Sequence, residues 1–323
     1  MLARSSVKSL NTVNLQGRET FQALPQSMVN LANSDINVPL RIGVVIPTLG
    51  SNDCLDKSLL SIAQQTREVA SVVVVDQSDS DRIEIICNEW SSTLPIRRVH
   101  TRRGASHARN IGLNQLGADV DIVGFLDDDC TYAANCFEEV EAGFYNNETA
   151  AISGRLISHE SRLRFGDHAQ SLDYRTVWTM AIEATMFCRI SVIKELNGFN
   201  EQLGIGNPSP WQSGEGTDLL LRMMGRGFKI YYQPTCEVTE HNENAGTKAS
   251  PALKSRKYGR GTGRVYRMHY SWPVCLWQVI RPLLGSLLSL TSGNRSQGLR
   301  RFQAAIGRWE GITGWLAGRL PKN

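Results

Sequence analysis

Short runs of apolar, mostly β-branched residues alternate with amphipathic stretches of helical length between residues 41 and 151. This alternation is typical of βαβ units, and it predicts an α/β fold with a mostly parallel central sheet flanked by helices. The uninterrupted run from Val72 to Val75 suits a strand that other elements cover on both faces. The predicted strands lie at residues 42–46, 72–75, 96–100 and 122–126, and the predicted helices lie between them at residues 53–64, 81–89 and 106–116.

The second half of the chain is less regular, but it contains further strand and helix patterns. We predict a strand near residues 151–156, an apolar segment at 181–190, a helix from about Asp218 to Arg226 and a strand near 229–233. We expect these elements to complete the same sheet rather than to form a second domain. The functional residues of such a sheet are expected at the carboxyl ends of its strands.

The two ends of the chain differ from this body. Residues 1–39 are rich in Ser, Asn and Gln and lack the long apolar stretch of a secretory signal, so we expect a flexible N-terminal arm before a main domain at 40–270. In the tail at 271–323, Arg281 and Pro282 interrupt the apolar residues before they reach a clean membrane span of about 20 residues. We therefore predict basic amphipathic helices lying on an anionic membrane, with packing on the main domain or a dimer contact as the alternatives.

Length and cysteine content refine this outline. With 323 residues, of which 41% are hydrophobic, the chain has enough apolar material for one large core. Its seven cysteines are irregularly spaced and include no Cys-x-x-Cys pair. We therefore expect buried thiols in a reducing compartment, and hence a cytoplasmic protein that is attached at most peripherally to the inner face of the cell membrane.

The net charge of +4 hides an asymmetry between body and tail. Residues 254–323 contain thirteen Lys and Arg but one acid, Glu310, and the rest of the chain is net negative. A basic tail on an acidic body suggests an anionic partner, such as phosphate groups or a membrane surface, whereas a solvated basic face is the alternative. We predict no nucleic-acid partner.

Three consecutive carboxylates, Asp127, Asp128 and Asp129, stand directly behind the predicted strand at 122–126. Like charges this close repel one another unless a cation offsets them. Oxygen ligands favour Mg²⁺ or Mn²⁺, which often bind one or two carboxylates together with substrate phosphates. His241 could complete the metal shell begun by Asp129. The alternative is a solvated acidic turn, with His241 as an ordinary surface or core residue.

Other polar residues end the neighbouring strands at the same predicted edge. Pro47 and Thr48 follow the first strand and Asp76 ends the second, where an acid can accept hydrogen bonds from a ribose or a base. The segment after the first strand is not Gly-x-Gly-x-x-Gly, and the chain has no Gly-x-x-x-x-Gly-Lys-Ser/Thr motif. A bound phosphate must therefore be held by metal and basic side chains.

Three arginines, Arg102, Arg103 and Arg109, flank a predicted helix start at residues 104–106. They could face a diphosphate there together with free backbone amides of the helix, although surface arginines often bind nothing. We favour Arg109, because a glycine that permits close packing follows three positions later.

Glycine-flanked Glu215 stands just before the apolar run at 219–221, in a predicted loop ahead of a helix that Thr217 could cap. A carboxylate in a partly desolvated loop is suited to take a proton from an attacking hydroxyl, so Glu215 is the first candidate for a general base and Asp218 is the second. Asp218 can instead favour the positive end of its helix and pair with Arg222 one turn later, which would be a structural role.

Five short motifs resemble, in their order and spacing, the family 2 glycosyltransferases. Each is weak by itself, but the combination is specific and covers roughly residues 41–270. The motifs are Val45-Ile46-Pro47-Thr48, Val75-Asp76-Gln77-Ser78, Ala108-Arg109-Asn110-Ile111-Gly112, Phe125-Leu126-Asp127-Asp128-Asp129 and Gly214-Glu215-Gly216-Thr217-Asp218. The resemblance implies a GT-A catalytic domain at 40–270, a divalent metal ion, a nucleoside-diphosphate-sugar donor, and inversion at the anomeric carbon by a single displacement.

Residue chemistry and resemblance together assign a role to each candidate. The roles are nucleoside binding for Pro47, Thr48 and Asp76, donor binding for Arg103, Arg109, Asp127 and Asp128, and metal binding for Asp127, Asp129 and His241. One departure matters: the family commonly has Glu-Asp where this chain has Glu215-Gly216, so Glu215 must replace the usual aspartate base or activity is altered. The segment at 197–201 resembles the family's Gly-Gly-Phe-Asp-Glu segment on the acceptor side.

These observations predict a glycosyltransferase in which Mn²⁺ or Mg²⁺ offsets the charge of the leaving nucleotide. The expected donor is a UDP-sugar, and the expected acceptor is a glycan or lipid-linked hydroxyl in polysaccharide or cell-envelope assembly. One alternative is a sugar nucleotidyltransferase, although the glycine-rich basic loop that such enzymes usually have after the first strand is missing. The other is a non-catalytic nucleotide-sugar-binding protein of the same fold, which Gly216 makes plausible.

Overall fold

The computed structural model describes residues 39–50, 54–158, 165–241 and 250–316, and the residues from Leu40 onward belong to one compact unit. The predicted arm at 1–39 lies almost wholly outside the described residues. The strands of the described ranges are β1 (Ile42–Thr48), β2 (Ser71–Asp76), β3 (Ile96–His100), β4 (Ile122–Phe125), β5 (Cys130–Tyr132), β6 (Thr149–Ile157), β7 (Gln170–Ser171), β8 (Met186–Arg189) and β9 (Lys229–Glu240). The helices are α2 (Leu55–Ala63), α3 (Arg82–Trp90), α4 (Ala105–Gln115), α5 (Cys136–Phe144), α6 (Val177–Met180), the 3-10 helix η1 (Glu183–Thr185), α7 (Ile190–Glu195), α8 (Glu215–Gly225), α9 (Pro251–His269), α10 (Trp272–Thr291) and α11 (Arg295–Thr313).

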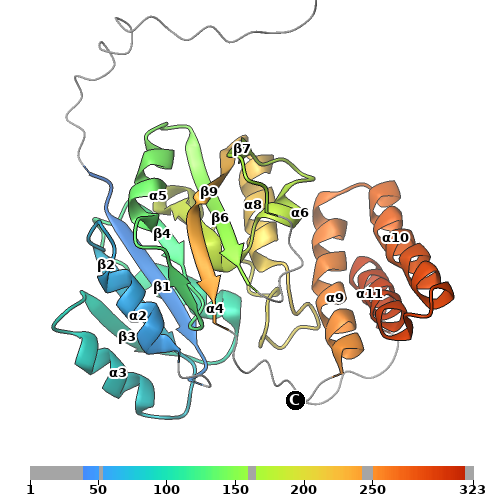
Figure 1. Cartoon of the computed structure of the whole chain (residues 1–323), viewed down its shortest axis with the longest axis horizontal. Helices are drawn as coiled ribbons and strands as arrows, with labels where there is room; N and C mark the ends of the chain where they lie inside the picture. Colours follow the sequence, from blue (N-terminus) through green and yellow to red (C-terminus); the bar gives the residue numbers. More distant parts are fainter. Residues whose placement is uncertain (1–38, 51–53, 159–164, 242–249, 317–323) are drawn as a thin grey trace, which may run out of the picture. The chain divides into compact units, whose positions relative to one another are not determined.

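One mixed sheet gathers the strands of the described residues in the order β3-β2-β1-β4-β8-β6-β9-β5, with β7 pairing with β9 (Figure 1). Strands β3, β2, β1 and β4 run parallel, as the alternation of strands and helices predicts. Strand β8 pairs antiparallel with both β4 and β6, so the second half of the chain completes the same sheet, as expected.

Both faces of this sheet are buried, which confirms the interpretation of the valine run. Val73 packs in one core with Leu113 of α4, whereas Val72 packs in the other with Leu59 of α2. All seven cysteines are buried and none is in a disulfide, as their irregular spacing predicts. The predicted helices at 53–64, 81–89 and 106–116 are confirmed as α2, α3 and α4, with ends that differ by one or two residues.

Strand β9 is longer than predicted, because it continues past residue 233 to Glu240. Its partner β6 has an irregular register between Ser153 and Arg155, where Gly154 lies. A Cβ on Gly154 would lie only 2.1 Å from the carbonyl oxygen of Cys236, so the close approach of the two backbones requires glycine there. This bulge lets the pairing resume and brings the end of β9 to β5.

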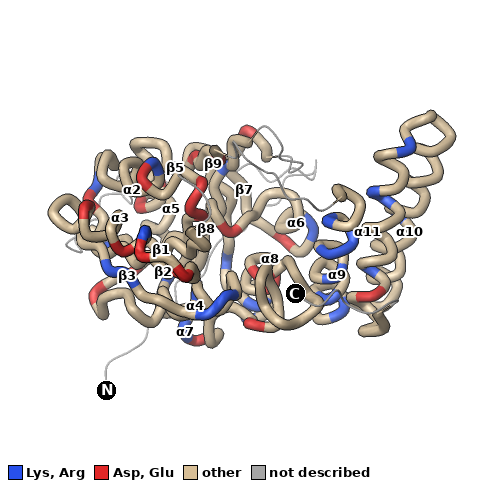
Figure 2. Tube along the Cα trace, turned by 90° about the horizontal axis from the view of Figure 1, so that it is seen from below, with Lys and Arg blue, Asp and Glu red and all other residues tan. Residues whose placement is uncertain are grey.

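Helices α9 and α11 approach each other closely, because glycines line their contact. A Cβ on Gly263 would lie 2.1 Å from the carbonyl oxygen of Arg308, which leaves no room for a side chain. Glu310 is fully buried at this contact and accepts hydrogen bonds from Arg256 and Arg260 at 3.1 and 2.7 Å. The one acid of the basic tail is thus neutralised inside the helices, and Figure 2 shows Lys and Arg along α9 and α11.

Helix α10 corrects the expectation that the apolar stretch of the tail is interrupted. It continues through Pro282 for 20 residues and is, by length and composition, apolar enough to cross a membrane. Proline has no N–H to donate to the carbonyl four residues earlier, which belongs to Gln278. Arg308 of α11 donates to that carbonyl instead, at 2.8 Å. The missing hydrogen bond is therefore replaced from the neighbouring helix.

Candidate active site

The polar ends of β1, β2 and β4 meet at one edge of the sheet, as predicted. Thr48 and Asp76 pair in register at the ends of β1 and β2, and Asp127, Asp128 and Asp129 follow β4. The Thr48 hydroxyl donates a hydrogen bond to the Asp128 carboxylate, which joins two of the strand ends directly. The acidic residues therefore gather where a substrate of this fold is expected to bind.

Asp76 is buried rather than open to a nucleoside. One carboxylate oxygen accepts hydrogen bonds from the backbone N–H and the hydroxyl of Ser78 at 2.8 and 2.7 Å, and the other accepts from Arg98 at 2.9 Å. Pro47, at the end of the neighbouring β1, is half-buried. In this structure Asp76 shapes the loop after β2, and the predicted contact with a ribose or base would have to replace one of these hydrogen bonds.

Arg109 is the centre of the site, where it joins two acids. Its guanidinium donates to Asp127 at 2.9 Å and to Glu215 at 3.2 Å, and only 4% of the residue is exposed. Burial by itself would lower the pKa of Arg109, but the two carboxylates hold that pKa above its ordinary value. The Phe199 ring centre lies 5.8 Å from the guanidinium carbon and contacts Phe125 edge-on, so packing also fixes the arginine.

Glu215 is the first residue of α8 and does not lie in the predicted loop. Gly214 precedes it with a left-handed φ of 88° and is the N-cap, so the prediction that Thr217 caps this helix is wrong. Only 6% of Glu215 is exposed. Burial, followed by the charge of Glu183, raises the pKa of Glu215 to about 7. A carboxyl with such a pKa can gain and lose a proton near neutral pH.

Glu183 is a site residue that sequence reasoning missed. It lies in η1, and one of its carboxylate oxygens accepts a hydrogen bond from the backbone N–H of Gly216 at 2.7 Å. A Cβ on Gly216 would lie 2.7 Å from that same oxygen. The side chain of Glu183 therefore occupies the space in which a side chain of residue 216 would begin. The available signal was weak, since Glu183 is a lone acid within the apolar segment at 181–190.

Asp218 is fully buried and bonded within the fold. One of its oxygens accepts from Arg222 Nε at 2.9 Å, which confirms the predicted pair on α8. The other lies 2.8 Å from His269 Nε2, at the end of α9. These bonds connect α8 to α9 and favour the structural role of Asp218 over its role as a second base.

The start of α4 differs from the prediction that free backbone amides would face a diphosphate. The N–H of Gly104 donates to Gln77 Oε1 at 2.7 Å, and that of the next residue donates to the carbonyl of Ile205 at 2.9 Å. These two N–H groups are therefore already bonded within the protein, to a side chain and to the loop around residue 205, and they do not face a phosphate. Arg102 and Arg103 are exposed.

His241 lies beside Asp129, although the predicted metal ligands do not form one cluster. Its backbone N–H donates to the carbonyl of Asp129 at 2.8 Å, and its Nε2 forms a hydrogen bond with the Thr131 hydroxyl at 2.8 Å. Within the described ranges, no three His, Cys, Asp or Glu side chains come together as metal ligands. The trio of Asp127, Asp129 and His241 is therefore not assembled, because Arg109 holds the first and Thr131 the last.

The acidic edge still suits a divalent cation that is shared with a substrate. Burial, followed by the charges of Asp127 and Asp128, raises the pKa of Asp129 to about 6, so a cation bound beside it would stabilise its ionised form. Mg²⁺ and Mn²⁺ commonly bind one or two carboxylates and take their other ligands from phosphate and water. The carboxylates at this edge therefore fit such an ion together with a diphosphate.

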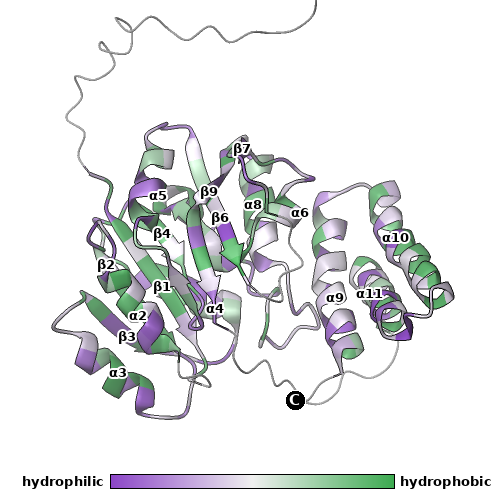
Figure 3. Ribbon diagram, in the orientation of Figure 1, coloured by the Kyte–Doolittle hydropathy of each residue, from purple (hydrophilic) through white to green (hydrophobic). Residues whose placement is uncertain are grey.

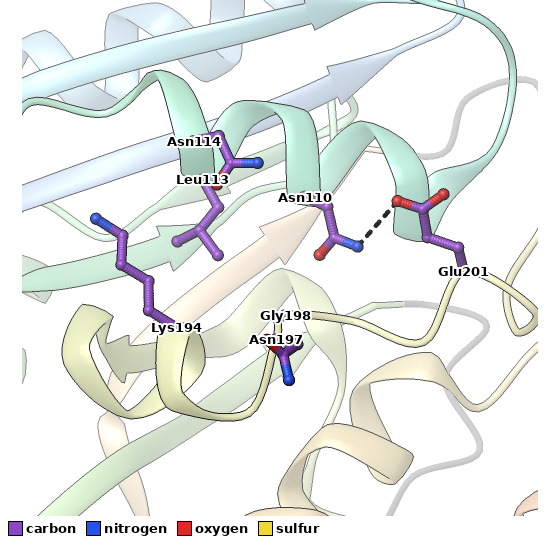
Figure 4. Close-up of a pocket in the computed structure, with 7 residues that line it drawn as sticks. All are labelled: Asn110, Leu113, Asn114, Lys194, Asn197, Gly198 and Glu201. Atoms are coloured by element: carbon purple, nitrogen blue, oxygen red, sulfur yellow. Dashed lines mark hydrogen bonds between the residues drawn. The ribbon is translucent and has the colours of Figure 1, made fainter.

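A pocket of about 360 Å³ lies between α4 and the segment after α7 (Figure 4). Its lining residues are Asn110, Leu113, Asn114, Lys194, Asn197, Gly198 and Glu201. Asn110 bonds to Glu201 at 3.1 Å and, through both ends of its amide, to the backbone of Phe199 at 2.8 and 2.9 Å. Because Phe199 packs on Arg109, these bonds hold the segment at 197–201 against the site.

Comparisons with known proteins indicate the family of the chain. The family model described as "Glycosyl transferase family 2" matches residues 43–195. The pre-mycofactocin glycosyltransferase of Mycobacterium tuberculosis is 29% identical over 146 residues, which cover 41% of this chain but only 29% of that relative. The O-antigen chain rhamnosyltransferase WbaN of Salmonella anatum is 23% identical over 192 residues, which cover 56% of this chain and 59% of that protein.

A solved structure extends the likeness beyond the matched residues. The mannosyltransferase of Pyrobaculum calidifontis, in complex with GDP-Man and Mn²⁺, has a TM-score of 0.59 to this chain at 14% identity. The match covers 84% of this chain and 87% of that one. At this identity the likeness shows the fold, and the expected GT-A fold is confirmed.

Proposed function

The chain belongs to glycosyl transferase family 2 through residues 43–195, and from this premise we propose that it transfers a sugar from a nucleoside diphosphate, in the first instance UDP, to a hydroxyl group. The reaction is metal-dependent and inverts the anomeric carbon. Its acceptor is a glycan or a lipid-linked saccharide in polysaccharide or cell-envelope assembly. The O-antigen rhamnosyltransferase among the relatives supports the acceptor class, and the GDP-Man and Mn²⁺ complex of the structural neighbour supports a nucleotide-sugar donor and a metal ion.

The observation that carries this proposal is the bridge formed by Arg109. This buried cation holds Asp127, a proposed metal ligand, at 2.9 Å and Glu215, the proposed base, at 3.2 Å. The two groups have to act on opposite sides of one reacting carbon, and a rigid connection between them fixes their separation. A solvated acidic turn would have no need of a buried arginine.

The proposed mechanism assigns each end of the bridge a part in one displacement. Asp127 and Asp129 would hold Mn²⁺ or Mg²⁺, which supplies positive charge to the diphosphate of the leaving nucleotide. The acceptor oxygen bonds to the anomeric carbon while the bond from that carbon to the diphosphate breaks, and the electron pair leaves with the nucleotide. The hydroxyl proton passes to the acids at the start of α8, where Glu215 is the predicted base.

An assay with nucleotide sugars separates this proposal from its alternatives. With Mn²⁺, the protein is expected to release nucleoside diphosphate slowly from a UDP-, GDP- or dTDP-hexose in water, and faster once an acceptor is present. Pyrophosphate release from a sugar 1-phosphate and a nucleoside triphosphate would instead identify a nucleotidyltransferase. Nucleotide binding without any turnover would identify a non-catalytic binding protein.

We further propose that α10 docks the protein on the cytoplasmic face of an anionic membrane. Figure 3 shows that α10 is mostly hydrophobic along its length. Its buried face carries small residues such as Ser286 and Ser289, whereas most of its large apolar side chains are exposed, which is the opposite of what is expected for a helix that faces water. The exposed ones are Trp272, Val274, Leu276, Trp277, Leu283, Leu284, Leu287, Leu288 and Leu290. Residues 254–323 carry thirteen Lys and Arg against one acid, and this excess of positive charge attracts anionic lipids.

Sedimentation with vesicles tests this docking. The protein is expected to bind vesicles of phosphatidylglycerol and phosphatidylcholine and to bind phosphatidylcholine alone much less. Replacing both Leu287 and Leu288 by Glu should reduce binding at least tenfold, because burying one leucine contributes about 2 kcal/mol. Ile85→Glu, at an exposed apolar residue of α3, is the matched control and should bind like the parent. Equal binding by the Leu287 and Leu288 variant would contradict the proposal, and loss of a dimer in that variant would favour the dimer alternative.

A further inference from the structure

Glu215 by itself offers an acceptor little access. Only 6% of the residue is exposed, and one of its carboxylate oxygens accepts a hydrogen bond from Arg109 at 3.2 Å. A general base has to come within hydrogen-bond reach of the proton that it removes, directly or through one water. An acceptor hydroxyl would therefore reach a carboxylate more easily if that carboxylate lay beside Glu215 but closer to the surface.

Glu183 is such a carboxylate. It is partly exposed, and it contacts the residue that follows Glu215, because it accepts the backbone N–H of Gly216 at 2.7 Å. Its charge raises the pKa of Glu215 and also that of Arg109, as expected of a carboxylate that lies close to both. Three elements from distant parts of the chain, α4, η1 and α8, thus bring one cation and two acids together.

The glycine at position 216 makes room for this arrangement. A Cβ on Gly216 would lie 2.7 Å from the Oε1 of Glu183 and 2.8 Å from its Cδ and Cγ, distances at which something must shift. A side chain on residue 216 would therefore displace the carboxylate of Glu183. The first turn of α8 consequently has two carboxylates beside it, one from Glu215 in the helix and one from Glu183 in η1.

We infer that Glu183 is a further catalytic residue, which meets the acceptor hydroxyl and receives its proton, with Glu215 as its buried partner. This inference rests on the proposed function. In the step, the O–H bond of the acceptor breaks and the proton moves to the carboxylate of Glu183. The acceptor oxygen bonds to the anomeric carbon as the bond to the diphosphate breaks, and the nucleoside diphosphate leaves with the electron pair.

The test has to separate proton transfer from capping, because Glu183 also accepts an N–H of the first turn of α8. Glu183→Gln keeps an oxygen that can accept this N–H but cannot take up a proton. We expect turnover to fall about a hundredfold, with the parental melting temperature and nucleotide affinity retained. Glu148→Gln, at an exposed pair with Lys229, is the matched control and should keep parental turnover. Parental turnover of Glu183→Gln would overturn the inference.

A rescue experiment tests the same inference through the space at residue 216. Glu183→Ala vacates that space and is expected to lose about a hundredfold in turnover. Adding Gly216→Asp to Glu183→Ala puts a carboxylate back in that space. We expect the double variant to turn over at least tenfold faster than Glu183→Ala. A folded, nucleotide-binding double variant that is no more active than Glu183→Ala would overturn the inference.

Each variant is assayed by release of nucleoside diphosphate from UDP-, GDP- and dTDP-hexoses with Mn²⁺, with water as the acceptor. If the parent protein releases none from any of these donors, the proposed function fails, and the inference fails with it. If the parent is active and Glu183→Gln matches it, the inference alone fails.

Discussion

Replacing Arg109 by alanine is expected to destabilise the fold by about 3 kcal/mol and to lower turnover at least a hundredfold. The change removes the cation that lies between Asp127 and Glu215 and leaves both acids, together with nearby Glu183, without a balancing charge. The main cost is at Glu215, because its carboxylate is buried and would lose its charged partner there. Denaturant unfolding measures the stability, and release of nucleoside diphosphate measures the turnover.

Two further variants sharpen this prediction. Arg109→Lys keeps the positive charge but lacks the guanidinium group that bonds to both acids. We therefore expect turnover to fall, with a smaller loss of stability than in Arg109→Ala. Arg226→Ala, which removes an exposed pair with Glu195, is the control and should change stability by less than about 0.5 kcal/mol. An Arg109→Ala protein with parental stability and turnover would contradict the view that this bridge organises the site.

Glu215→Gln is expected to bind the donor nucleotide with parental affinity but to transfer sugar about a hundredfold more slowly. The amide can still accept the hydrogen bond from Arg109, so the geometry of the bridge is kept. What is lost is the buried carboxylate that partners Glu183 when the acceptor gives up its proton. Titration with the nucleotide and a transfer assay on the same preparation measure the two effects separately.

The pH dependence of transfer gives a second readout of Glu215. Burial and the charge of Glu183 raise its pKa to about 7, against the opposing charge of Arg109. Below that pH the carboxyl holds its proton and the base is weak, so transfer by the parent should rise as pH increases through about 7. Glu215→Gln should lose this rise. If Glu215→Gln is fully active, or if its pH profile matches that of the parent, Glu215 takes no part in the proton transfer.

The parallel part of the sheet was predictable from the sequence because its requirements are local. A parallel strand that is covered on both faces has to be apolar throughout, whatever packs on it, and the run from Val72 to Val75 meets this requirement. Parallel strands also end at one edge of the sheet, so the positions of Thr48, Asp76 and Asp127 could be inferred from where each strand ends.

Two elements were predicted too short, because their continuity depends on other parts of the chain. Strand β9 continues past residue 233 only because Gly154 on β6 permits a bulge. Helix α10 continues through Pro282 with Arg308 of α11 bound to the carbonyl that the proline leaves free. Neither compensating residue can be found from the pattern within the element itself.

The site was predictable in its residue types but not in its pairings. Arg109 and Glu215 are 106 positions apart, so their contact follows from the packing of α4 and α8 rather than from any local motif. Glu183 was missed for the same reason, because a lone acid in an apolar segment gains meaning only when η1 brings it to Gly216. The burial of Asp76 likewise depends on Arg98, which lies on the neighbouring strand β3.

Calorimetric titration with UDP, GDP and dTDP, with and without Mn²⁺, tests the central claim that the acidic edge binds a nucleotide through a metal ion. The parent protein is expected to bind one of these nucleotides only with Mn²⁺, and Asp129→Ala should lose that binding while it keeps the parental fold by circular dichroism. If none of the three binds in the presence of Mn²⁺, or if Asp129→Ala binds as tightly as the parent, the acidic edge is not the donor site.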